Sequence, residues 1–284
     1  KEVVFTSGAT ESNNIAILGA IRSMGTSTGH IITTNIEHPS VLDPCTHLET
    51  LGWNVTRLAV NDQGLVSVGQ LEAAITPQTK LVAIMAANNE IGTVQPIAAL
   101  AELCRSKGIQ FHTDAAQACG KVPLNFTEFG LDTLSFSGHK IYGPKGVGAL
   151  IVRRSRPKVH IAPIQFGGGQ ERGVRPGTLP TPLLVGLGAA AEISERALED
   201  GTIARQRTLR DTLSARLQAQ LDNITINGSM EHRLPNNLNI RFNGIDASAL
   251  IVSLPTLQFS TGSACTSETL TPSKVLTAIG LTAS

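Results

Sequence analysis

Cysteines are few in this chain, and long apolar runs are missing. The 284 residues include four cysteines, and none of them stands at C-x-x-C spacing or at the density of a secreted disulfide scaffold. This usage favours a reducing compartment, which would be the cytoplasm or an organelle matrix. The longest apolar stretches are interrupted by glycine and no signal-peptide pattern opens the chain, so we expect a soluble protein that does not associate with membranes.

Clusters of like charge and the common nucleotide-binding motifs are missing as well. The net charge is +1 and the 16% of charged residues form no long runs, so we expect no nucleic-acid partner. No G-x-G-x-x-G follows a strand pattern and no G-x-x-x-x-G-K-[ST] occurs, which argues against dinucleotide and P-loop sites. His38, His112, Asp114 and His139 could ligate a metal, but no two share the i, i+4 spacing of a helix face, and we expect none.

Strand and helix patterns alternate from residue 1 to about Val152. The expected strands of this part cover residues 1–6, 30–34, 55–60, 80–86, 110–113 and 132–136. Such alternation predicts an α/β fold with a doubly wound, mainly parallel sheet. After about residue 200 the pattern changes to α+β, so we expect a large domain over residues 1–200 and a smaller C-terminal domain over 201–284.

Lys140 follows one of these strands directly and precedes a glycine-rich turn. Ligands of α/β proteins bind at the carboxyl ends of the strands. A lysine drawn into such a site loses solvation, which favours its neutral, nucleophilic amine, and an amine of this kind forms Schiff bases. The alternative is a surface turn with solvated lysines, a role that suits Lys145 better because it stands between Pro144 and Gly146.

Other polar segments also follow expected strands. Residues 7–14 precede a helix pattern, where free backbone amides favour an anion and Gly8 allows close approach, although simple N-capping is the alternative. His38 and the segment 88–92 lie at the same edge of the predicted sheet. Asp114 ends a buried strand, where a carboxylate needs a cationic partner. We therefore expect one ligand site at this edge.

Cys265 stands in a segment of small residues, 258–267, within the expected smaller domain. A buried, inert thiol is the usual interpretation of a single cysteine, but Gly262, Ser263, Thr266 and Ser267 offer it little apolar cover. A thiol in such a setting is accessible enough to react.

Seven segments, taken together and in order, resemble the cysteine desulfurases, the NifS/IscS-like group of the class V, fold-type I pyridoxal-phosphate enzymes. They are TSGATESNN (6–14), EHPSV (37–41), NNEIGTVQP (88–96), HTDAAQACGK (112–121), SFSGHKIYGPKGVGAL (135–150), GGGQERGVRPGTLPTP (167–182) and STGSACTS (260–267). The match runs over nearly the whole chain.

The resemblance implies a role for each matching residue. It implies that Lys140 holds pyridoxal phosphate as a Schiff base, that Asp114 pairs with the pyridine nitrogen, and that Gln117 bonds to the phenolic oxygen of the ring. His38 would stack on the ring and transfer protons, and Asn89 would lie beside the ring oxygen and the substrate carboxylate. The implied phosphate ligands are Ala9, Thr10, Ser137 and His139, with Thr178 reaching the phosphate of a partner subunit, which implies a homodimer with composite sites.

The implied reaction removes sulfur from L-cysteine. Lys140 would take the Cα proton, and the thiolate of Cys265 would attack the substrate sulfur and become a persulfide while alanine leaves. The sulfur would pass to an acceptor protein for iron–sulfur cluster assembly or the synthesis of another sulfur-containing cofactor.

Two departures and two rival functions accompany the resemblance. The family has an arginine in a C-terminal S-x-R-F segment and a longer N-terminus, so we expect a chain that is incomplete at both ends, with an incomplete smaller domain.

A selenocysteine lyase or a transaminase would use the same Lys140 and Asp114, but a transaminase needs no reactive Cys265. A scaffold without activity would need none of these residues.

Overall fold

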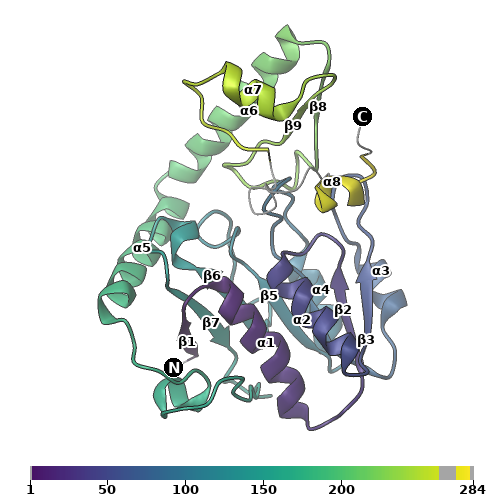
Figure 1. Ribbon diagram of the computed structural model, residues 1–284, viewed down its shortest axis with the longest axis vertical. Coiled ribbons are helices and arrows are strands. Elements are labelled where there is room, and N and C mark those ends of the chain that lie inside the picture. The colour runs from purple at the N-terminus through teal and green to yellow at the C-terminus, as the bar shows by residue number, and fades with distance from the viewer. Residues whose placement is uncertain (1, 262–272, 282–284) are drawn as a thin grey trace.

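The computed structural model describes residues 2–261 and 273–281. The sheet of the first half contains β1 (Val3–Thr6), β2 (His30–Thr34), β3 (Asn54–Leu58), β4 (Thr79–Ala83), β5 (Gln110–Asp114), β6 (Thr133–Ser137) and β7 (Gly148–Val152). These form one seven-stranded sheet in the order β1-β7-β6-β5-β4-β2-β3 (Figure 1). All neighbours from β6 to β3 pair in parallel, and only β7 runs against the other strands. The prediction of a mainly parallel α/β sheet is confirmed.

Helices cover both faces of this sheet, because successive side chains of a buried strand point to opposite faces. On one face, Ile31 and Leu81 pack against α1 (Ala9–Met24) and α2 (Pro39–Thr50). On the other face, Ile32 and Val82 belong to a core shared with α3 (Val68–Ala74) and α4 (Ile97–Ser106). Doubly wound packing of this kind leaves the carboxyl ends of the strands free to form a site.

The expected alternation of strands and helices is wrong beyond β5. No helix separates β5 from β6 in the described chain, and β6 returns through the short 3-10 helix η1 (Gly138–Ile141) into β7, which pairs with it antiparallel. A strand buried on both faces has the same apolar pattern in either direction, so the reversal leaves no periodic signal in the sequence. The expected strand over 80–86 also ends earlier, at Ala83.

The second half of the chain is mainly helical. The elements are η2 (Gln170–Gly173), α5 (Thr181–Glu199), α6 (Thr202–Gln220), β8 (Ile224–Ile226), β9 (Ile240–Phe242), α7 (Ala247–Ser253) and α8 (Lys274–Ala278). Strands β8 and β9 pair antiparallel in a sheet of their own. Figure 1 shows α6, α7, β8 and β9 gathered at the end of the molecule beyond the large sheet. A smaller domain over residues 201–284 is the division that we propose.

Within residues 2–261 and 273–281, no helix combines the length and the apolar character that crossing a bilayer requires.

Candidate functional site

A cleft of about 1040 Å³ lies at the carboxyl edge of the large sheet. Among its lining residues are Ala9, Thr10, His38, Asn89, Asp114, Gln117, Ser137, His139 and Lys140. Each of these residues belongs to the site expected from the sequence. The structure therefore brings together side chains from α1, α2, η1 and the loops after β4 and β5, because parallel strands deliver their following loops to the same edge.

One end of the cleft is formed by the start of α1. The N-cap is Gly8, and no side chain caps this helix, so the alternative of simple side-chain N-capping is not what the structure has. Uncapped first-turn amides and the helix dipole favour an anion. Gly8 and Gly148 allow the close packing here, since a Cβ on Gly148 would lie 2.7 Å from the Cα of Gly8. Ser137 Oγ lies 3.0 Å from His139 Nδ1 beside this turn.

Asp114 lies at the end of β5 and is 5% exposed. Its Oδ1 accepts the Ala116 N–H at 2.8 Å, and its Oδ2 accepts an Asn13 Nδ2–H at 2.7 Å. Burial raises the pKa of Asp114, and these two hydrogen bonds oppose the rise. Among the described residues no Lys, Arg or His forms a salt bridge with it. The carboxylate is therefore hydrogen-bonded by neutral donors, and the cationic groups that act on it among the described residues, chiefly on His38 and Lys140, lie beyond salt-bridge distance.

His38 is the N-cap of α2, and Pro39 occupies the first helical position as expected. Its Nδ1 accepts the backbone N–H of Ser40 at 3.1 Å and lies 2.8 Å from Ser40 Oγ. A ring nitrogen that accepts an N–H carries no proton itself, so neutral His38 has its proton on Nε2. The ring can donate from Nε2 while the helix start fixes its position.

Lys140 lies in η1, directly after β6, as its sequence context predicted. The expectation that its side chain loses solvation is wrong, because Lys140 is exposed within the cleft. The turn that follows is tight: Tyr142 has a φ of 63°, and the Gly143 N–H bonds to the Gly138 carbonyl at 2.8 Å. Lys145 is also exposed and lines the same cleft, so the two lysines differ in their place on the turn and not in exposure.

Glu37 was missed by the sequence reasoning, although it stands next to His38. It lines the cleft and is 4% exposed. Its Oε1 accepts from Thr34 Oγ1 at 2.7 Å and from the Met85 N–H at 2.9 Å, whereas Oε2 has no partner among the described residues. Burial, with a smaller effect from Asp114, raises the pKa of Glu37 to about 8. This carboxyl is therefore protonated in the folded protein at neutral pH.

We expect Glu37→Gln to change how stability depends on pH. Between the ordinary pKa of 4.5 and the folded-state value of about 8, the unfolded chain loses the Glu37 proton while the folded protein keeps it. The free energy of unfolding therefore falls as pH rises through this window. Glutamine removes this loss, so the stability of Glu37→Gln relative to wild type should rise by about 4 kcal/mol between the two ends of the window.

Urea unfolding at both ends of the window measures the difference. Glu231→Gln is the matched control, because that side chain is 86% exposed. An advantage of Glu37→Gln that stays constant with pH would contradict the buried, protonated state of Glu37.

The glycine-rich loop around Arg175 is fastened to the start of α1. Arg175 Nε donates to Glu11 Oε1 at 2.9 Å, and both side chains are mostly buried. Burial opposes ionisation of Glu11, but hydrogen bonds from Arg175 and Ser7 lower its pKa. Arg175 therefore neutralises the negative charge of Glu11 at the start of α1, where the free amides favour an anion. Thr178, in the same loop, is exposed and is not among the residues that line the cleft, so its expected contact with a partner subunit remains a prediction.

The cysteines that the structure describes are poor nucleophiles. Burial raises the pKa of Cys45, Cys104 and Cys119 to about 12 in each case. A thiol of such pKa carries almost no thiolate at neutral pH. Cys265, the predicted sulfur carrier, lies outside the described residues.

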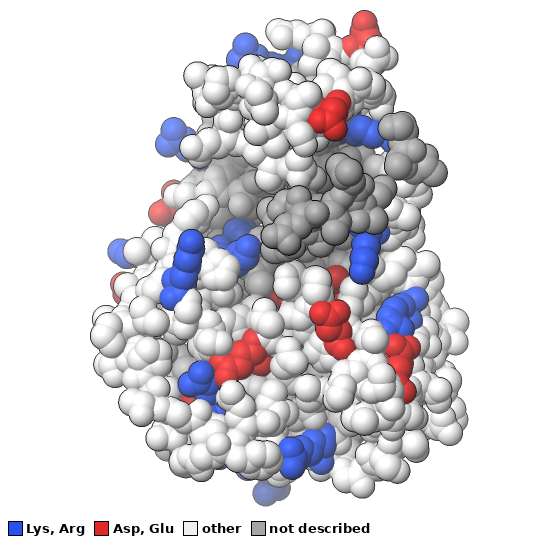
Figure 2. All heavy atoms as spheres, viewed as in Figure 1, with Lys and Arg blue, Asp and Glu red and all other residues white. Residues whose placement is uncertain are grey.

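The surface charge of the visible face is mixed. Figure 2 shows lysine and arginine side chains scattered between aspartate and glutamate, with no broad area of one sign. In the part of the chain that the structure describes, no three His, Cys, Asp or Glu side chains form a group that could hold a metal ion.

Comparison with known proteins places this geometry in context. The family model described as aminotransferase class-V matches residues 1–281. A probable mitochondrial cysteine desulfurase of Dictyostelium discoideum is 51% identical over 281 residues, covering 99% of this chain and 62% of that protein. Cysteine desulfurase IscS of Rickettsia akari is 48% identical, covering 99% of this chain and 68% of that protein.

A solved structure described as SspA in complex with cysteine has a TM-score of 0.85 and 42% sequence identity. The match covers 99% of this chain and 78% of that chain. This chain spans about 62% of the length of the Dictyostelium relative.

Proposed function

The chain belongs to the aminotransferase class-V family, in its cysteine desulfurase group, and on that premise we propose that it removes sulfur from L-cysteine with the help of pyridoxal phosphate. One observation carries the proposal: Lys140, Asp114, His38 and the uncapped start of α1 all line a single cleft. An amine, a buried carboxylate and an anion-binding turn match the aldehyde, the ring nitrogen and the phosphate of that cofactor.

The residues of the cleft fit the cofactor in chemistry as well as in position. The α1 amides, Thr10, Ser137 and His139 would hold the phosphate, and Asp114 would pair with the ring nitrogen, supplying it with the salt-bridge partner that the described protein lacks. Gln117 would bond to the phenolic oxygen, Asn89 would lie beside that oxygen and the substrate carboxylate, and His38 would cover the ring face. When bound, pyridoxal phosphate supplies an electron sink for negative charge at the substrate Cα.

Each protein group would then have one task. The Lys140 amine takes the Cα proton, and the exposed position of Lys140 lets the substrate reach it. Asp114 keeps its negative charge beside the ring nitrogen, and His38 can donate a proton from Nε2. The Cys265 thiolate forms a bond to the substrate sulfur as the Cβ–S bond breaks, and the electron pair of the broken bond stays with the three-carbon fragment, which takes up protons and leaves as alanine.

The partners that we propose follow from the same reaction. A persulfide on Cys265 must be passed to an acceptor, so we propose a sulfur-acceptor or iron–sulfur scaffold protein as a transient partner. We also propose a homodimer, in which Thr178 of each subunit reaches the phosphate in the other site.

Asp114→Asn tests this function, because asparagine keeps the shape of aspartate and removes its charge. We expect alanine release from L-cysteine, in the presence of pyridoxal phosphate, to slow by about a hundredfold or more. Asp222→Asn, at an exposed residue far along the sequence, is the control and should retain the full rate. Alanine is measured by amino-acid analysis, and sulfide is measured by a colour assay in the presence of an added thiol, which reduces the persulfide and becomes a disulfide. A wild-type protein that releases neither product from L-cysteine contradicts the proposed function, and an Asp114→Asn protein at full rate contradicts the role of Asp114.

A further inference from the structure

The buried side-chain amide of Asn13 lies beneath the cleft. Asn13 is in α1 and is 0% exposed. Its Nδ2 donates to Asp114 Oδ2 at 2.7 Å and to Ser40 Oγ at 2.8 Å. Its Oδ1 lies 3.0 Å from His112 Nε2 and also accepts from Ser135 Oγ. One side chain therefore joins β5, β6 and α2 to α1.

The orientation of this amide is fixed by its partners. If the amide were flipped, its oxygen would face the Asp114 carboxylate at hydrogen-bond distance with no proton between them. Burial lowers the pKa of His112 to about 3, so this imidazole is neutral at neutral pH. It therefore has one N–H, which it donates from Nε2 to Asn13, while Nδ1 accepts from Thr133 Oγ1 at 2.9 Å. The amide nitrogen thus always faces Asp114 and Ser40.

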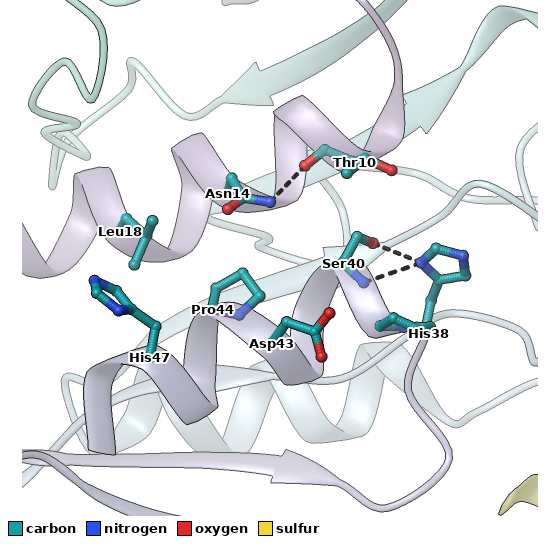
Figure 3. A pocket seen from close by; sticks show the side chains of 9 residues that line it. Thr10, Asn14, Leu18, His38, Ser40, Asp43, Pro44 and His47 are labelled. Atoms are coloured by element: carbon teal, nitrogen blue, oxygen red, sulfur yellow. Dashed lines mark hydrogen bonds between the residues drawn. The ribbon is translucent and has the colours of Figure 1, made fainter. Parts of the chain in front are cut away.

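The second donor of Asn13 extends the network to His38. Ser40 Oγ receives an N–H from Asn13, so its own hydrogen is free to point to His38 Nδ1, 2.8 Å away. Figure 3 shows both contacts of Ser40 with the His38 ring, one from its hydroxyl and one from its backbone nitrogen. Both leave the proton of neutral His38 on Nε2.

We propose that Asn13 is a positioning residue that holds the Asp114 carboxylate in place and directs the Ser40 hydroxyl toward His38 Nδ1. This inference rests on the proposed function, in which Asp114 and His38 contact the cofactor. Asn13 itself touches only other protein groups. Without its amide, Asp114 keeps one described hydrogen bond, from Ala116, and His112 and Ser135 lose a buried partner. A hydrogen bond to a charged group contributes more than one between neutral groups, so the Asp114 branch dominates.

The neighbouring residue supplies a matched control. Asn14 is the next residue of α1, and its Nδ2 donates to the Thr10 carbonyl within the same helix at 2.9 Å (Figure 3). We compare Asn13→Leu with Asn14→Leu, and add Asn13→Ala as a variant that cannot clash. Ser40→Ala breaks the branch to His38 and leaves the bond between Asn13 and Asp114 in place.

Two readouts are needed, and neither is turnover. The affinity for pyridoxal phosphate is measured by fluorescence titration. Nitrogen NMR of histidine-labelled protein identifies the protonated ring nitrogen of His38 and gives the chemical shift of Nδ1, which responds to the hydrogen bonds that Nδ1 accepts, with His38→Gln for assignment. We expect the Asn13 variants to bind pyridoxal phosphate about tenfold more weakly and to change the Nδ1 chemical shift of His38, because the Ser40 hydroxyl is no longer directed toward it. Ser40→Ala should show the same change in the Nδ1 chemical shift, because only the backbone N–H of residue 40 then donates to Nδ1, with affinity within about twofold of wild type. Asn14→Leu should match wild type in both.

The possible outcomes separate this inference from the proposed function. Asn13→Ala with wild-type affinity, or wild-type protein with the His38 proton on Nδ1, overturns the inference. If neither Asn13 variant folds, Ser40→Ala decides, and an unchanged Nδ1 chemical shift of His38 overturns the network. A wild-type protein that binds no pyridoxal phosphate contradicts the proposed function. The His38 spectra of the same variants still decide whether Asn13 and the Ser40 hydroxyl set the hydrogen bonds at His38 Nδ1.

Discussion

Replacing Lys140 with alanine is expected to abolish covalent attachment of pyridoxal phosphate and, with it, all release of alanine from L-cysteine. The amine of Lys140 is the group that we propose to bond to the aldehyde and to take the Cα proton. No other residue of η1 is a lysine that could replace it. The wild-type protein should absorb in the visible range and should keep the cofactor through denaturation after borohydride reduction. Lys140→Ala should lose both properties, and turnover should fall by several orders of magnitude.

Lys145→Ala is the control for this experiment, because Lys145 is a second exposed lysine of the same cleft. It should retain the borohydride-stable adduct. Unchanged α-helical circular dichroism would show that the fold of Lys140→Ala survives. If borohydride fixed the cofactor to Lys140→Ala, or if Lys145→Ala lost the adduct, Lys140 would not be the lysine that bonds to the cofactor.

Cys265→Ala is expected to remove the persulfide and alanine release while leaving pyridoxal phosphate bound. The reasons are the small polar neighbours of Cys265 in the sequence and the character of the other thiols. Burial holds the pKa of Cys45, Cys104 and Cys119 near 12, so none of them supplies a thiolate at neutral pH. Mass spectrometry after incubation with L-cysteine should find one added sulfur on Cys265 in the wild type and none in the variant.

Cys119→Ala is the matched substitution, because Cys119 is the partly accessible cysteine among the described ones. It should form the persulfide at the wild-type rate. Full alanine turnover by Cys265→Ala, or an added sulfur on one of the other three cysteines, would refute Cys265 as the sulfur carrier.

The helices and the general plan of the sheet could be predicted because their signals are local. In α4, Ile97, Leu100, Ala101 and Cys104 are buried, and this 3.6-residue period is visible in the sequence. The α/β plan with its mainly parallel sheet was predicted correctly, and the family similarity identifies it as fold-type I. The division into two domains is still a prediction.

The site residues were predicted from motifs, and the structure shows that most of them share a cleft, but their environments could not be predicted. Exposure of Lys140 depends on how η1 packs against β6 and the distant helix α5, which no local pattern encodes. The raised pKa of Glu37 comes from burial by segments distant in the chain, such as the one that contains Met85. Thr178 and Cys265 would act through contacts that the described chain does not contain.

By itself, the sequence determined which residues bear the chemistry and in what order they follow the strands. Strand ends, turns and helix starts depend on residues that are close together in the sequence. Only the tertiary structure decided that β7 runs against its neighbours, that neutral amides hold Asp114, and that Asn13 links Asp114 to His38. The physical reason is distance along the chain. Asn13 and Asp114 are separated by 101 positions, and a hydrogen bond between them exists only when α1 is packed on β5.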